Sequence, residues 1–256
     1  MRPLRLAMDA WRFFLRRRRC LACGSLFFAV NFAGAAPDDF FARGVAAYQA
    51  GAFPEAAAAF EKSAQTRPAA GTFLNLGLAE WQRGHAGAAM LAWEKARWLR
   101  PRDPRAAENL KFARAVTQVA EPPLTWFETA STWLPSSAWM WLAGASLWLA
   151  VGALVVPRFF RWRRSGWPQW LAALAAGIFL FSLTANLGVV SRTHLGLVLR
   201  NQTPLRLTPT RDGEAITTLA GGEPVRWLRT RGNYYFVRTG DGSGWIERGA
   251  LGLVNE

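Results

Sequence analysis

The chain has 256 residues and a formal net charge of +14, from 31 basic and 17 acidic side chains. Most of the excess lies in residues 1–35, which carry +6, and in residues 136–194, which carry +5. These segments contain the long apolar runs, where basic residues mark the cytoplasmic side of a membrane protein, so we expect a membrane protein with no nucleic-acid partner.

Residues 1–35 have the pattern of a signal peptide. A basic start ends in Arg16–Arg19, and an apolar stretch follows that closes on the small residues Ala33, Gly34 and Ala35. The stretch has sixteen residues, fewer than the roughly 20 that span a bilayer, although an uncleaved membrane anchor is the alternative. Both cysteines, Cys20 and Cys23, lie in this leader. The mature chain is therefore expected to lack disulfides and cysteine-ligated metal.

Residues 36–119 repeat with a period of 33. The matched positions are Gly44 with Gly77, Tyr48 with Trp81, Gly51 with Gly84, Ala56 with Ala89, Phe60 with Trp93, and Pro68 with Pro101. Each unit is predicted to be two helices joined by a tight turn at Gly51 or Gly84 and ended by proline. A third helix is expected to begin at Pro104, with Asp103 as its N-cap.

This pattern resembles the tetratricopeptide repeat, in which the first helix of each unit lines a concave, peptide-binding groove. The resemblance implies an all-α array whose groove candidates are Phe41, Val45, Tyr48, Leu74, Asn75, Leu78, Trp81 and Asn109. Tyr48 and Trp81 are equally explained as core aromatics. Asn75 and Asn109 are the stronger candidates, because a polar side chain on a buried face needs a hydrogen-bond partner.

Residues 120–137 predict an amphipathic juxtamembrane linker, with apolar side chains at helical spacing between prolines. Residues 138–156 and 167–190 are uncharged runs that predict two transmembrane helices. The loop 157–166 between them holds no acid and four arginines, Arg158, Arg161, Arg163 and Arg164. By the positive-inside rule this loop is cytoplasmic, and both flanking soluble segments are then periplasmic.

Residues 195–256 change to strand-like runs separated by turn clusters such as 211–213, 221–224 and 241–244. Five or six short strands predict a small closed barrel. The order of motifs, from Pro204-Leu205-Arg206 to Gly244-Trp245-Ile246, resembles the bacterial SH3-like domain. That resemblance implies binding of cell-wall peptides or partner proteins. Trp245 is expected in the barrel core.

No catalytic, metal-binding or cofactor-binding pattern is found in the sequence, and we expect no enzymatic activity. The fold expected is therefore a multidomain membrane protein: an all-α repeat array, two transmembrane helices and a small all-β SH3-like barrel. This order resembles the BatE-type proteins of bacterial Bat (aerotolerance) operons. The resemblance implies partners in the same membrane complex, namely von Willebrand A-domain proteins and a MoxR-type ATPase.

Two functions follow as hypotheses. The first is a non-enzymatic inner-membrane scaffold that presents two periplasmic protein-binding modules, as part of a Bat-type envelope complex in aerotolerance or stress. The second is a cell-wall sensor, in which the SH3-like domain binds peptidoglycan peptides and the repeats relay its occupancy.

Overall fold

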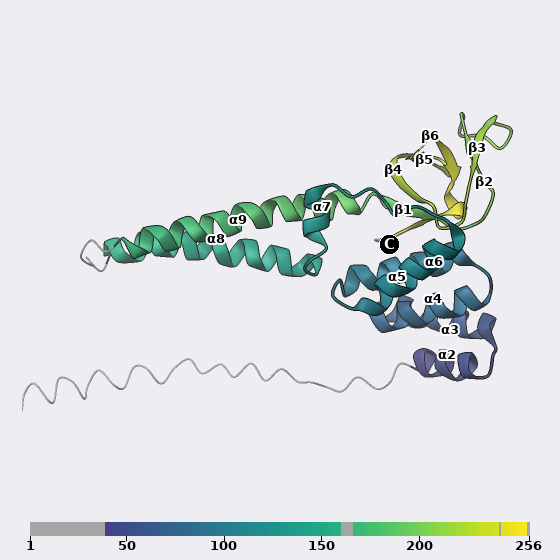
Figure 1. Cartoon of the computed structure of the whole chain (residues 1–256), viewed down its shortest axis with the longest axis horizontal. Coiled ribbons are helices and arrows are strands. Elements are labelled where there is room, and N and C mark those ends of the chain that lie inside the picture. Colours follow the sequence, from purple (N-terminus) through teal and green to yellow (C-terminus); the bar gives the residue numbers. More distant parts are fainter. Residues whose placement is uncertain (1–38, 160–165, 241, 255–256) are drawn as a thin grey trace, which may run out of the picture. The chain divides into compact units, whose positions relative to one another are not determined.

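The structure is a computed structural model that describes residues 39–159, 166–240 and 242–254 (Figure 1). The expected signal peptide, and Arg161, Arg163 and Arg164 of the expected cytoplasmic loop, lie outside the described residues. Among the described residues, five helices come first and form what we call the helical region. They are α2 (Asp39–Gln49), α3 (Phe53–Thr66), α4 (Ala70–Gln82), α5 (Ala86–Leu99) and α6 (Pro104–Thr117).

Glycine turns fold the helical region into hairpins. Gly51 joins α2 to α3 with a φ of 76°, and Gly84 joins α4 to α5 with a φ of 80°. A positive φ strains residues that carry a Cβ, so glycine at these two positions permits the tight turns. Each helix packs on the next one in the chain, from α2 through to α6. Both predicted turns are confirmed.

The sequence period of 33 corresponds to a packing contact that is repeated in both helical hairpins. A Cβ added to Gly44 would lie 2.7 Å from the ring of Phe60, and one added to Gly77 would lie 2.3 Å from Nε1 of Trp93. The two glycine–aromatic contacts are thus the same contact, repeated one unit later. In both hairpins the missing side chain lets a buried aromatic ring lie directly against the facing helix. The assignment to the tetratricopeptide family itself stays a prediction.

Helix α6 begins as the sequence predicts. The side chain of Asp103 accepts a hydrogen bond from the backbone N of Arg105 at 3.1 Å, which satisfies one of the free donors at the helix start. The guanidinium of Arg105 also pairs with Asp103 at 2.7 Å. Helix α6 packs on α5 and contributes Leu110 and Ala113 to the core of the helical region.

A short helix, α7 (Trp126–Ser131), leads into two long apolar helices, α8 (Ser136–Phe159) and α9 (Trp167–Arg192). Helices α8 and α9 pack along one another, and α7 packs on α9. A Cβ on Gly188 of α9 would lie 2.3 Å from the carbonyl oxygen of Phe127, so this glycine brings α7 close. Pro157 lies inside the last turn of α8 rather than after it.

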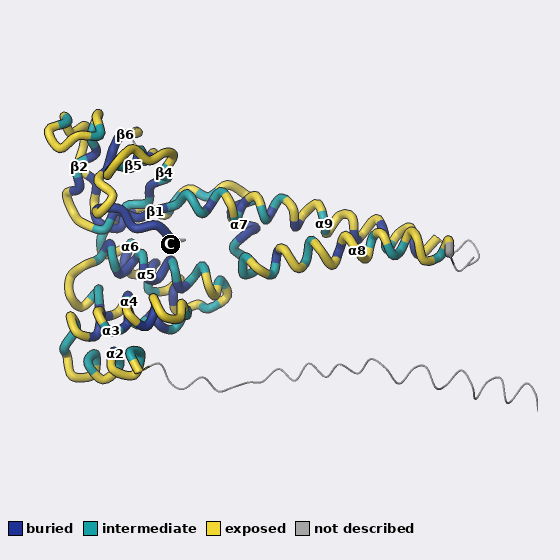
Figure 2. The backbone as a smooth tube through the Cα atoms, turned by 180° about the vertical axis from the view of Figure 1, so that it is seen from behind, coloured by how far each residue is buried: buried dark blue, intermediate teal, exposed yellow. Residues whose placement is uncertain are grey.

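The segments Ser136–Arg158 and Trp167–Arg192 are long and apolar enough to cross a membrane. They are also poorly covered by protein. Only 11% of the most apolar window of the first and 22% of that of the second is buried, and Figure 2 shows the exposed surface running along both helices. Large side chains such as Trp141, Trp148 and Trp170 are 75–80% exposed. A core helix of a soluble domain would instead be mostly buried.

The C-terminal part is one antiparallel sheet of seven strands. They are β1 (Leu195–Val198), β2 (Thr203–Arg206), β3 (Ala215–Leu219), β4 (Pro224–Arg231), β5 (Tyr234–Arg238), β6 (Ser243–Glu247) and β7 (Leu251–Leu253). The order β3-β2-β6-β5-β4-β1-β7 leaves β3 and β7 as edges, so the hydrogen-bonded ladder of the described strands does not close as the sequence led us to expect. Strand β7 was not predicted. Trp245 is buried, as expected.

Helix α5 packs directly on this sheet. A Cβ on Gly87 would lie 2.5 Å from the carbonyl oxygen of Val198, and one on Gly252 would lie 2.2 Å from Leu91. Leu197 of β1 and Val254, which directly follows β7, belong to the same buried cluster as Met90 in α5. The helical region and the sheet therefore share part of one core.

Candidate functional site

A hollow in the surface of the helical region is the first candidate site. It has a volume of about 300 Å³ and is lined by Val45, Tyr48, Gln49, Phe60, Asn75 and Leu78, which come from α2, α3 and α4. We call it the helical hollow. This volume is at the lower end of the range of small-ligand pockets, and it suits one or two side chains of a peptide.

The walls of the helical hollow are apolar, but they carry two free amides. Tyr48 packs edge-on against Phe53, which holds its ring in place. The side chains of Asn75 and Gln49 make no hydrogen bond within the described part of the chain. Asn75 is half-buried and Gln49 is exposed. A half-buried amide such as that of Asn75, without an intramolecular partner, is available to a ligand, and amides pair with both peptide N–H and C=O groups.

Four of the eight groove candidates line the helical hollow: Val45, Tyr48, Asn75 and Leu78. Phe41 lies beside it, because its ring packs on Phe60 at 5.7 Å. The other three lie elsewhere. Leu74 is 5% exposed in the core, Trp81 packs between Trp93 and Phe112, and Asn109 is on α6. Gln49 and Phe60 were not proposed, although the matched pair Phe60 and Trp93 placed Phe60 at the helix interface.

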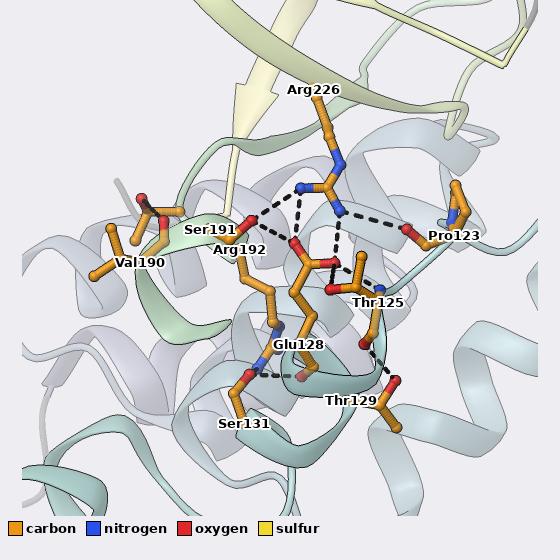
Figure 3. Close-up of polar contacts among 10 residues, drawn as sticks. Pro123, Thr125, Glu128, Thr129, Ser131, Val190, Ser191, Arg192 and Arg226 are labelled. Carbon is orange, nitrogen blue, oxygen red and sulfur yellow. Dashed lines mark hydrogen bonds and ion pairs between the residues drawn. The ribbon is translucent and has the colours of Figure 1, made fainter. Parts of the chain in front are cut away.

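A second candidate is a buried polar junction, shown in Figure 3, where α7, the end of α9 and β4 meet. Glu128 is 0% exposed. Its carboxylate accepts hydrogen bonds from both Nη1 and Nη2 of Arg226, each at 2.8 Å, and from the Ser191 hydroxyl at 2.5 Å. It also accepts the backbone N and the hydroxyl of Thr125, at 2.8 and 2.9 Å. We call these four residues the Glu128 junction.

The electrostatics of the Glu128 junction keep the carboxylate charged. Burial alone would raise the pKa of Glu128, but the hydrogen bonds from Arg226, Ser191 and Thr125 outweigh burial and lower the pKa to about 2. Two-pronged binding by a guanidinium also fixes the relative orientation of the two side chains. The junction therefore ties the sheet to the base of α8 and α9.

Only the contact between Thr125 and Glu128 in this junction could have been predicted from the sequence. Thr125 followed three residues later by Glu128 is the spacing of a helix-start capping box, which is present in the structure. The partner could not be found in this way, because Arg226 lies 98 residues further along the chain.

The sheet carries a third feature, an arginine stacked on aromatic rings. The guanidinium of Arg229 lies 4.7 Å from the ring centre of Phe236 and 5.4 Å from that of Trp245. Arg229 is exposed, and the neighbouring Leu228 is also exposed. A cation held over aromatic faces can pair with a carboxylate while the rings contact an apolar group.

Residues 201–252 match the bacterial SH3 domain family. The matched range runs from the turn before β2 to β7, so the sheet is this bacterial SH3 domain with β1 added in front. The match leaves the helical region and α7–α9 outside. No curated protein matches the chain. Within the described residues, no group of three or more His, Cys, Asp or Glu side chains could hold a metal ion.

Of the four arginines expected to set the topology, the structure describes Arg158, which is exposed near the end of α8. The bacterial SH3 domain contacts the opposite end of the α8–α9 pair through the Glu128 junction. The helical region contacts it through Arg102, whose Nε donates to the carbonyl oxygen of Trp133, between α7 and α8, at 3.3 Å.

Proposed function

We propose that the protein is a non-enzymatic membrane scaffold whose helical region binds a peptide segment of a partner protein. The observation that carries this proposal is the helical hollow, where apolar walls surround the unpartnered amide of Asn75. An apolar side chain of the peptide would enter between Tyr48 and Leu78. The Asn75 amide would donate to, or accept from, the peptide backbone.

Two properties of α8 and α9 support membrane insertion. Both helices expose apolar surface along their length, far more than the few hundred Å² that a soluble protein tolerates in one patch. Helix α8 has 24 residues and α9 has 26, lengths of about 36 and 39 Å, which suffice to cross a bilayer core. With the arginine-rich loop in the cytoplasm, the helical region and the bacterial SH3 domain face the periplasm of the inner membrane.

The test uses photo-crosslinking of the full chain in native membranes. A photoreactive amino acid is placed at Gln49, on the rim of the helical hollow, and at Gln65 of α3, which is exposed and does not line it. We expect a discrete crosslinked product at position 49 that is absent at position 65. Asn75→Ala should reduce that product several-fold, because the peptide loses its polar contact.

Asn109→Ala is the matched control, since Asn109 is also a half-buried asparagine on a repeat helix but lies outside the helical hollow. An equal loss of product in both variants would contradict the assignment of the site. The crosslinked partner is identified by mass spectrometry. The BatE-type resemblance names the first candidates on the periplasmic side, which are the von Willebrand A-domain membrane proteins of a Bat-type complex.

A second function is favoured by the bacterial SH3 domain match together with the stacked Arg229. We propose as the alternative a cell-wall sensor that binds peptidoglycan peptides, which carry free carboxylates. Arg229 would pair with such a carboxylate, and the exposed Leu228 would contact an apolar part of the peptide.

Co-sedimentation of the detergent-solubilised full chain with purified peptidoglycan tests this alternative. We expect the sedimented fraction to fall in Arg229→Gln and to stay unchanged in Arg200→Gln, which removes an exposed arginine that stacks on no described ring. If the wild-type chain stays in the supernatant at low and at physiological salt, the sensor hypothesis is wrong and the scaffold hypothesis is untouched.

A further inference from the structure

A cleft between the helical region, the end of α9 and the bacterial SH3 domain has a strongly basic lining. Its charged and aromatic lining residues are Glu94, Arg97, Trp98, Arg114 and Arg192, and the sheet closes it with Gly222. The cleft has a volume of about 20 Å³, enough for one water-sized particle. We call it the arginine cleft.

The charges in the arginine cleft do not balance. Three guanidinium groups face one buried carboxylate, Glu94, which already pairs with Arg97 at 3.2 Å and with Arg114 at 2.6 Å. Glu121 also pairs with Arg114, at 3.4 Å, and with Arg97, at 4.0 Å, but its side chain is 66% exposed and so neutralises little of the charge inside.

Arg192 is the unpaired member. It is 7% exposed, and none of the ion pairs found in the described part of the chain includes it. Its contacts are a stack on the ring of Trp98 at 4.7 Å and one hydrogen bond to the Ser131 hydroxyl at 3.2 Å (Figure 3). A buried arginine without a directly paired carboxylate is costly. The charges of Glu94 and Glu128 act favourably on Arg192 from a distance, but they do not outweigh its burial and the repulsion from Arg97.

Arg97 adds a second unmet requirement. Its Nε is buried and makes no hydrogen bond, although the Glu94 carboxylate lies 3.2 Å away. Buried donors are normally satisfied by a well-aligned acceptor, and the misaligned contact with Glu94 leaves Nε able to donate to a bound water or ion. Here the surrounding charge favours an acceptor with a negative charge.

We propose that the arginine cleft binds one anionic atom, held by Arg97 and Arg192. The small volume suits chloride, or a single oxygen of a phosphate that reaches in from the opening. Chloride from solvent and the headgroup phosphate of a phospholipid both supply this chemistry. The second source is within reach, because Arg192 ends the candidate span α9 and the exposed Trp126 and Trp133 lie on the neighbouring α7 segment.

The first arm of the test measures thermal unfolding of the full chain in neutral detergent. Sodium chloride replaces sodium gluconate at constant ionic strength, so that general screening stays the same. A ligand that binds only the folded state raises Tm saturably, here by roughly 3–6 °C at about ten times its dissociation constant. This arm does not depend on whether α8 and α9 cross a membrane.

The second arm repeats the thermal unfolding in gluconate with three samples: nanodiscs of phosphatidylglycerol, nanodiscs of phosphatidylcholine, and detergent with added inorganic phosphate. If the Tm of the wild type exceeds that of Arg192→Gln in both nanodiscs by more than it does in detergent, and inorganic phosphate has no effect, the headgroup phosphate is the source. A rise with chloride alone identifies the free ion.

Arg192→Gln should abolish the dependence of Tm on the anion, and Arg97→Gln should do the same if the first variant does not fold. Arg105→Gln is the matched control, because Arg105 is exposed, pairs with Asp103 and lies outside the arginine cleft. It should keep the wild-type response. A wild-type Tm that is the same in every anion and lipid overturns the proposal and leaves a water-filled cleft.

Discussion

Replacing Glu128 by alanine is expected to lower the free energy of unfolding by about 3 kcal/mol. Loss of one member of a buried ion pair typically costs about 3–5 kcal/mol, and the Arg226 side chain, which is 27% exposed, can recover part of its hydration. For a chain of this size the change corresponds to a fall in Tm of roughly 6–12 °C, measured by thermal unfolding in detergent.

Glu121→Ala is the control for this experiment. Glu121 also pairs with arginine, but its side chain is 66% exposed, and exposed ion pairs contribute about 0–1 kcal/mol. A Glu128→Ala variant that melts within a degree or two of Glu121→Ala would mean that the Glu128 junction does not hold the domains together. The double variant Glu128→Ala with Arg226→Ala should cost less than the sum of the two single changes.

The same carboxylate gives the protein an acid-sensitive contact. The pKa of Glu128 is about 2 in the folded chain against an ordinary value of 4.5, because hydrogen bonds to the charged form outweigh its burial. The stability from this lowered pKa is fully present above about pH 4.5 and is lost as the pH falls towards 2. Glu128→Gln should remove that part of the pH dependence.

Gly87→Ala is expected to separate α5 from the bacterial SH3 domain. The new Cβ would lie 2.5 and 2.6 Å from the carbonyl oxygens of Val198 and Leu199, and backbone cannot move aside as a flexible side chain can. Overpacking of this kind costs about 1–3 kcal/mol, even though alanine favours the helix. We expect a lower Tm and faster proteolysis in the segment that joins α9 to β2.

Gly71→Ala is the control for this experiment, and we do not expect it to lower Tm. Gly71 is also in a helix of the helical region, but a Cβ there would meet no atom within 4 Å. Its Tm should be unchanged or slightly higher, because alanine stabilises a helix by about 0.5–1 kcal/mol relative to glycine. Equal behaviour of the two glycine variants would show that the α5–sheet contact does not form in solution.

Local chemistry explains why some elements could be predicted. The turns at Gly51 and Gly84 and the cap at Asp103 each depend on residues within a few positions, and the glycine–aromatic contacts recur at the sequence period. Strand β7 was missed because three residues, Leu-Gly-Leu, show neither alternation nor a bounding turn cluster.

The contacts that join the parts could not be predicted, because nothing local encodes them. In the sequence, nothing distinguishes Gly87 and Gly252 from other glycines. Their role becomes visible only in the structure, where both lie at the contact between α5 and the sheet. The eight groove candidates were chosen by repeat position alone. Whether such a position faces the helical hollow, as Asn75 does, or the core, as Leu74 does, depends on the rotation of α4 against α2 and α3.

The start of α8 and the end of α9, which lie at the same end of the helical pair, are both attached to α7. Trp139 at the start of α8 donates to the Ser131 carbonyl oxygen at 3.2 Å, and Ser191 at the end of α9 donates to Glu128. Under the proposed insertion, neither helix could tilt alone. A change in bilayer thickness, which tilts transmembrane helices, would tilt α8 and α9 together and rotate α7 and the sheet with them. The thickness of the bilayer would then set the distance from the membrane, and the orientation, at which the helical hollow is presented to its partner.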